Sequence, residues 1–116
     1  MHNFKQLQIW VKSMELVKEI YLLTDSFPKL EKFGLISQMQ RAAVSVPANI
    51  AEGSAKSNNK DFARFLEIST GSLFELETLL LLATNLNYID SVVSENIQIK
   101  ISELEKMIYG FKQKLN

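Results

Sequence analysis

The sequence predicts an all-α protein, an up-down-up-down antiparallel four-helix bundle. Apolar residues recur at spacings of three and four along four long segments, as they do on the buried side of amphipathic helices. Residues that interrupt helices are rare, with 4 Gly and 2 Pro in a chain of 116. The connections between segments are short, which favours antiparallel neighbours. Residues 1–116 are expected to form one domain, because a chain of this length can enclose a single core.

The first two helices are separated by a turn signal. The first is expected from about Gln6 to Thr24, and DSFPK (25–29) ends it because Asp, Ser and Pro favour a turn. The second is expected from about Lys29 to Ala55. It contains Pro47, which cannot donate a backbone hydrogen bond and whose ring presses on the preceding turn. We therefore expect the second helix to be kinked at Pro47.

The last two helices have clearer boundaries. Asn58, at the end of the polar link KSNN (56–59), precedes Asp61 by three residues and resembles a capping pair that opens the third helix. That helix is expected to reach about Asn87. The fourth opens near Asp90, and its apolar residues alternate spacings of four and three, typical of a bundle helix: Ile97, Ile101, Leu104, Ile108, Phe111 and Leu115.

The third helix carries two adjacent apolar stripes. The first consists of Phe62, Leu66, Leu73, Leu76 and Leu80. The second consists of Phe65, Ile68, Leu79, Leu82 and Leu86. One interpretation is a wide helix buried on both stripes. The other is that the second stripe faces another subunit, since an exposed apolar patch of this size would favour aggregation.

Catalytic and metal chemistry have little support. The chain has no Cys and a single His, His2, so it lacks the ligands for a di-iron bundle site or a zinc site. The sequence around Gly53 lacks the second glycine that the phosphate-binding Walker pattern places directly before Lys-Ser/Thr. We expect a protein that is not an enzyme, with no catalytic, cofactor-binding or metal-binding residues.

Charge and hydropathy limit the partners. Lys and Arg number 13, as do Asp and Glu, which argues against a dedicated nucleic-acid binder. The balance is uneven along the chain, with a net +3 in residues 1–64 and −3 in 65–116, which hints at head-to-tail association. The start shows no signal-peptide plan, and the most apolar window (73–86) is shorter than a membrane span. We expect a cytoplasmic protein with no membrane partner.

Polar residues also recur at helical spacing on the second and third helices. Each set is either a solvated helix face or half of a network between the two helices. In the network interpretation, Glu75 meets Asn49 or Arg41. The candidate network residues are Arg41, Asn49, Glu52 and Glu75.

Five segments together resemble one protein family. They are QIW (8–10), FPKLEKFGL (27–35), QMQRAAVSVPANIAEGSA (38–55), DFARFLEISTGSLFELET (61–78) and LNYI (86–89). They resemble the four-helix-bundle proteins encoded in intervening sequences of 23S ribosomal RNA genes. The resemblance implies a protomer that assembles into a homopentameric ring. It extends to the accessory variability determinant of diversity-generating retroelements, a basic ring that works with a reverse transcriptase and nucleic acid. Gln40 stands where the family pattern commonly has the first of two arginines.

Two functions remain at this point. The first is a non-enzymatic, homo-oligomeric scaffold or interaction protein whose main partner is itself. The second is an accessory protein that binds RNA or DNA through modest basic patches repeated around a ring. The candidate phosphate contacts are Lys12, Lys18, Arg41, Lys56, Lys60 and Arg64. A different protein partner is a further possibility that the sequence leaves open.

Overall fold

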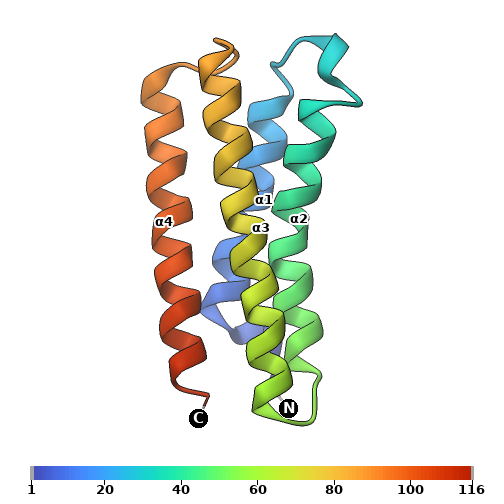
Figure 1. Ribbon diagram of the computed structural model, residues 1–116, viewed down its shortest axis with the longest axis vertical. Coiled ribbons are helices and arrows are strands. Elements are labelled where there is room, and N and C mark those ends of the chain that lie inside the picture. Colours follow the sequence, from blue (N-terminus) through green and yellow to red (C-terminus); the bar gives the residue numbers. More distant parts are fainter. Residues whose placement is uncertain (1, 116) are drawn as a thin grey trace.

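The computed structural model describes residues 2–115 as four long helices that alternate in direction (Figure 1). The helices are α1 (Gln8–Thr24), α2 (Leu35–Ser54), α3 (Asn59–Asn85) and α4 (Ser91–Gln113), with short 3₁₀ turns η1 (Phe4–Gln6) and η2 (Lys29–Glu31). They pack side by side into a body of 44 × 24 × 20 Å. No strand occurs among these residues. The predicted all-α four-helix bundle is confirmed.

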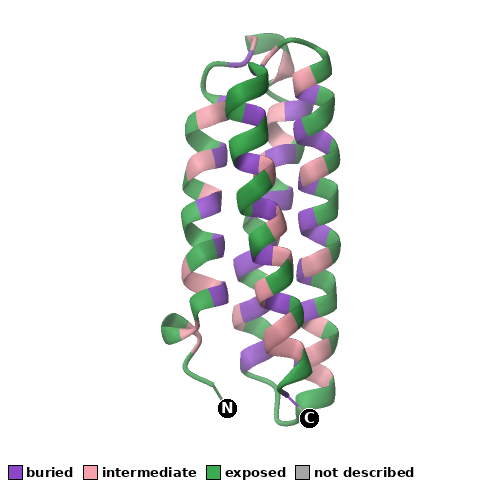
Figure 2. Cartoon of the chain, turned by 90° about the vertical axis from the view of Figure 1, so that its left-hand side faces the viewer, coloured by how far each residue is buried: buried purple, intermediate pink, exposed green. Residues whose placement is uncertain are grey.

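One apolar core runs the length of the bundle. Buried residues lie on the sides of the helices that face one another (Figure 2). Every helix contributes fully buried side chains, such as Ile20, Met39, Leu66 and Ile101. The first apolar stripe of α3 is entirely buried, as the sequence indicated. The α2–α3 contact is the most extensive between helices, and the α1–α4 contact is the least extensive.

The start of α2 differs from the sequence-based expectation. We expected this helix from Lys29, whereas α2 begins at Leu35, after η2 and Gly34. Gly34 has φ −110° and ψ −112°, so it interrupts the helical path. Glu31 caps the start of α2. Its Oε1 atom accepts a hydrogen bond from the Leu35 N–H at 3.2 Å. The α1 helix likewise begins at Gln8, two residues later than expected, because Leu7 is extended.

The connections around α3 use well-defined caps. Asn58 Oδ1 accepts a 2.9 Å hydrogen bond from the Asp61 N–H, which confirms the predicted capping pair. At the other end Asn87 has φ 65°, and the Tyr88 N–H reaches back to the Ala83 carbonyl at 3.0 Å. This is the Schellman arrangement, and Asn tolerates its left-handed position better than most residues. The turn brings Tyr88 towards η2, where its hydroxyl meets Glu31.

Pro47 lies in a helix that continues on both sides of it. The helix is uninterrupted from Leu35 to Ser54, and the Pro47 ring is buried. Side chains bond to carbonyls of this turn: Ser69 Oγ donates to Val46 O at 2.9 Å, and Asn49 Nδ2 donates to Ser45 O at 2.8 Å. The kink at Pro47 stays a prediction.

Over residues 2–115, none of the helices has a stretch that is both long and apolar enough to span a bilayer.

Candidate functional site

A small polar network joins α2 to α3, the two helices with the most extensive contact. Ser72 Oγ donates to Ser45 Oγ at 2.8 Å, and Asn49 Nδ2 donates to the same oxygen at 2.9 Å. Ser69, fully buried, bonds to the Val46 carbonyl one turn away. Each of these groups has a partner, so the network satisfies polar atoms that the packing removes from water.

The network is built from different residues than the sequence suggested. Asn49 takes part, but Arg41, Glu52 and Glu75 are exposed. Among residues 2–115 no hydrogen bond or ion pair joins these three to one another or to Asn49 within the protomer. Short serine side chains let the helices approach, which leaves the longer charged side chains at the edge of the contact.

Gly53 shows how close this approach is. A Cβ atom added at Gly53 would lie 2.7 Å from the Cβ of Phe65 and 2.9 Å from a ring carbon of Phe62. No side chain fits without moving the helices apart. Lys56 then crosses the outer side of Phe65, with its ammonium 4.9 Å from the ring centroid.

The second apolar stripe of α3, which we call the α3 face (Phe65, Ile68, Leu79, Leu82 and Leu86), is partly buried in the protomer. Leu79 is 8% exposed and belongs to the core, so its expected place on an outer face is corrected. Phe65 is half-buried against the end of α2. Ile68, Leu82 and Leu86 are each 46% exposed. At about 100° per residue, Leu86 lies in line with Ile68 and Leu82 about 40° away, so the three share one side of α3, with the exposed Glu75 between Ile68 and Leu82 on that side.

Other exposed apolar residues were not singled out from the sequence. Phe74 and Leu81 lie on a different side of α3 from the α3 face, and both are exposed. Leu30 and Phe33 project from the α1–α2 connection, where Phe33 is 89% exposed. Their exposure depends on the 3₁₀ turn η2 and on Gly34. The sequence-based prediction of a continuous helix from Lys29 contained neither feature.

The six candidate phosphate contacts are all exposed but do not form one patch. Lys56, Lys60 and Arg64 cluster at the α2–α3 connection, at the lower end of the bundle in Figure 1. We call these three residues the basic end. Arg41 is on α2, roughly 20 Å along the helix from Lys56 at a rise of about 1.5 Å per residue. Lys18 is on α1, away from the α2–α3 connection.

Two further lysines reach the basic end through the antiparallel topology. Lys5 is in η1, which packs against α2, and the His2 N–H lies 3.4 Å from the Ser54 carbonyl. Lys114 follows α4, whose end is held there by a hydrogen bond from Asn59 to the Leu115 carbonyl. These lysines are far from residues 56–64 in sequence, so only the fold places them together.

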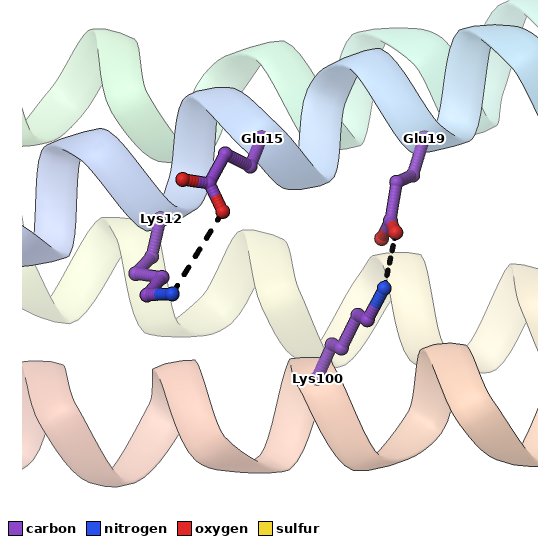
Figure 3. A network of polar contacts seen from close by, with 4 residues as sticks. All are labelled: Lys12, Glu15, Glu19 and Lys100. Carbon is purple, nitrogen blue, oxygen red and sulfur yellow. Dashed lines mark hydrogen bonds and ion pairs between the residues drawn. The ribbon is translucent and has the colours of Figure 1, made fainter.

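A groove between α1 and α4 is lined by paired charges (Figure 3). Its volume is about 160 Å³, and Leu16, Leu104 and Met107 contribute its apolar lining. The Lys100 ammonium pairs with Glu19 across the groove, and the Lys12 ammonium lies 3.8 Å from Glu15. Lys12, a candidate phosphate contact, therefore has a carboxylate neighbour on its own helix.

The His2 ring packs against two aromatic side chains. Its ring meets Phe62 edge-on at 5.1 Å and Phe111 at 5.9 Å between centroids. Over residues 2–115, no group of three or more His, Cys, Asp or Glu side chains is placed to hold a metal ion.

Comparison with known proteins establishes the family. The model of the 23S rRNA-intervening sequence protein family matches residues 5–110, so the chain belongs to this family. Among solved structures, it is similar to a protein of unknown function from the S23 ribosomal protein family of Bacteroides thetaiotaomicron, with 25% identity and a TM-score of 0.82. That match covers 90% of this chain and 95% of the other. No curated protein matches.

Proposed function

We propose that this protein is a non-enzymatic scaffold or interaction protein that assembles into a homo-oligomer through the α3 face. The supporting observation is the line of three half-exposed aliphatic side chains, Ile68, Leu82 and Leu86, on the longest helix of the bundle. Burial of a fully exposed side chain of this kind contributes about 1.5–3 kcal/mol, and each of these three, already about half-buried, would contribute roughly half of that. Contact with a second copy of the protein would bury these three side chains.

A ring is the proposed form of the assembly. The sequence resemblance implies a homopentamer, and a head-to-tail contact closes into a ring when its rotation fits. The net +3 of residues 1–64 and the net −3 of residues 65–116 suit a contact between unlike surfaces. Gly71 lies next to the α3 face, and a Cβ there would meet nothing within 4 Å, so a neighbouring helix has room to approach.

Charge substitutions on the α3 face test this proposal. We expect Ile68→Glu and Leu82→Glu to shift the mass measured by light scattering towards the protomer, because a carboxylate is costly in an apolar interface. Circular dichroism should show an intact helical bundle, since both positions are exposed in the protomer. Val92→Glu is the matched control, because Val92 is an exposed apolar residue on α4. Wild-type mass in both α3 variants would refute the role of this face.

Phe74→Glu distinguishes the two exposed sides of α3. Phe74 is exposed about 80° around the helix from Leu82 and about 120° from Ile68. We expect this variant to keep the wild-type mass. If Phe74→Glu dissociated the assembly and Leu82→Glu kept the wild-type mass, the interface would lie on the side of α3 that carries Phe74.

A second candidate is an accessory protein that binds RNA or DNA at the basic end. The observation that favours it is the convergence of Lys56, Lys60 and Arg64 with Lys5 and Lys114 at one end of the bundle. An oligomer would repeat this end around its axis and so multiply the phosphate contacts. Neutralising phosphates releases counterions, so such binding is strongest at low salt.

Binding to labelled RNA and DNA at increasing salt tests the second candidate. We expect Lys60→Glu and Arg64→Glu to weaken binding and to reduce its salt dependence, as predicted for lost phosphate contacts. Lys29→Glu, in the exposed connection between α1 and α2 at the other end of the bundle, is the control with the same change of charge. Undetectable binding by the wild-type protein at about 50 mM salt would rule this candidate out.

A further inference from the structure

Two charged side chains on neighbouring helices have no partner of opposite charge within the protomer. Arg41 is the one basic residue of α2, and Glu75 lies on α3. Both are exposed, and among residues 2–115 neither takes part in an ion pair. By contrast, Lys12, Lys100 and Lys112 each have a carboxylate partner. Arg41 and Glu75 are therefore both available to a second molecule.

Arg41 lines a shallow groove on the α1–α2 side of the bundle, with a volume of about 360 Å³. This Arg41 groove is lined by Tyr21 of α1 and by Ser37, Gln40, Arg41, Val44 and Ser45 of α2. Within the described part of the chain no Asp or Glu lines it, whereas carboxylates line both the α1–α4 groove and a hollow between α3 and α4. Tyr21 and Val44 are 46% and 41% exposed, so apolar surface lies beside the guanidinium. The groove fits an occupant that presents a carboxylate among apolar groups.

The α3 face presents this combination of groups. Glu75 comes seven residues after Ile68 and seven before Leu82, so about 10 Å along the helix separates it from each. Half-exposed aliphatic side chains therefore flank its carboxylate in both directions. No Lys or Arg of α3 follows Arg64, so no nearby basic residue of that helix competes for Glu75.

We propose that the α3 face of one copy docks onto the Arg41 groove of a second copy, where Glu75 pairs with Arg41. This inference rests on the proposed homo-oligomer and names the surface that the α3 face contacts. The guanidinium of Arg holds a carboxylate through two parallel hydrogen bonds. Arg and Tyr are also among the residues that most often anchor protein interfaces. The exposed parts of Tyr21 and Val44 supply the apolar contact for Ile68 and Leu82.

The charges also specify which surfaces meet. Two α3 faces brought together would place Glu75 carboxylates on both sides of the contact, and like charges opposed in an interface weaken binding. The α3 face and the Arg41 groove differ in shape and charge, so their contact is head-to-tail. A contact of this kind closes into a ring when its rotation fits.

Charge reversal at either residue tests the pair. We expect Arg41→Glu and Glu75→Arg each to raise the dissociation constant of the assembly by about 100-fold or more, because each opposes like charges in the contact. Sedimentation equilibrium over a range of concentrations measures this change. Circular dichroism should show an intact bundle, since both residues are exposed. Lys106→Glu and Glu95→Arg, at exposed positions on α4, are the matched controls and should associate like the wild-type protein.

Two rescue experiments show whether the pair joins separate copies. The double variant with Arg41→Glu and Glu75→Arg should associate within about tenfold of wild type, because opposite charges again face each other. An equimolar mixture of the two single variants should form assemblies that neither forms alone, because each copy supplies the charge that the other lacks. Mixing would not rescue a pair formed within one copy.

The outcomes separate this contact from the oligomer itself. Single variants with wild-type association, or a double variant that associates no better than the single variants, would overturn the proposed pair. Dissociation by Leu82→Glu would then still support assembly through the α3 face. If Arg41→Glu kept the wild-type mass but lost RNA binding, the groove would be assigned to phosphate groups instead. A wild-type protein that is monomeric at every concentration would refute the oligomer and this contact with it.

Discussion

The phenolic hydroxyl of Tyr88 donates a 2.9 Å hydrogen bond to Oε2 of Glu31, a residue 57 positions earlier in the chain. The other carboxylate oxygen of Glu31 accepts the Leu35 N–H at the start of α2. The Tyr88 ring packs against Phe27, with 5.5 Å between centroids. One carboxylate therefore ties the α1–α2 connection to the α3–α4 connection.

Replacement of Tyr88 by Phe tests this tie. The hydrogen bond to Glu31 is the main cause that raises the pKa of Tyr88 above its ordinary value, followed by burial and by the charge of Glu31. The bond stabilises the fold below the ordinary pKa of 10.0, and its contribution disappears as pH rises through the raised pKa. We expect Tyr88→Phe to lower Tm at neutral pH. In alkaline solution the Tm of this variant should decrease less with rising pH than the Tm of the wild-type protein.

Thermal unfolding followed by circular dichroism measures this effect. Tyr21→Phe, at an exposed position on α1, is the control and should leave Tm nearly unchanged. Equal Tm values for Tyr88→Phe and wild type at neutral pH would contradict a stabilising role for the bond.

A methyl group at Gly53 should separate α2 from α3. The added Cβ would lie 2.7 Å from the Phe65 Cβ, a distance that requires the helices to shift. We expect Gly53→Ala to lower the free energy of unfolding by about 1–3 kcal/mol, as overpacking does in other cores. Chemical denaturation at constant pH gives this value directly.

Gly110→Ala is the matched control for the Gly53 substitution. A Cβ at Gly110 meets nothing within 4 Å, and Ala is the better helix former. This variant should raise the free energy of unfolding by about 0.5–1 kcal/mol. The account of the α2–α3 contact fails if the two alanine variants change stability in the same direction.

Removal of the Ser45 hydroxyl should disrupt the α2–α3 network. Ser45→Ala leaves both Ser72 Oγ and Asn49 Nδ2 without the acceptor they share, so we expect a loss of about 1–2 kcal/mol in unfolding free energy. Ser72→Ala removes one of the same bonds, and the two losses should therefore be less than additive. Ser57→Ala in the exposed α2–α3 connection should have little effect. Additive losses from Ser45→Ala and Ser72→Ala would show that the bonds act independently.

The sequence predicted the architecture because helix periodicity and caps are local signals. The third helix begins after Asn58 as expected, since its capping bond to Asp61 involves neighbouring residues. The start of α2 was placed six residues too early. The Glu31 carboxylate that caps this start also accepts a hydrogen bond from Tyr88, a residue distant in sequence that the fold brings close.

The candidate site was predicted less completely, for reasons of packing. Periodicity places Leu79 with Leu82 on one stripe, but Leu79 is buried and belongs to the core. The network between α2 and α3 was expected to involve Glu75, whereas the close contact uses Ser45 and Ser72. Pairing between helices depends on their separation, which apolar periodicity does not encode. The positions of Lys5 and Lys114 at one end of the bundle likewise follow from topology.

The mass of the native assembly is the most direct test of the proposal that the α3 face joins copies of this chain. The protomer mass is 13.2 kDa. Native mass spectrometry, with light scattering over a range of micromolar concentrations, should give a whole-number multiple of that mass, and the proposed ring predicts a fivefold multiple. A stable species of 13.2 kDa at every concentration would contradict the account.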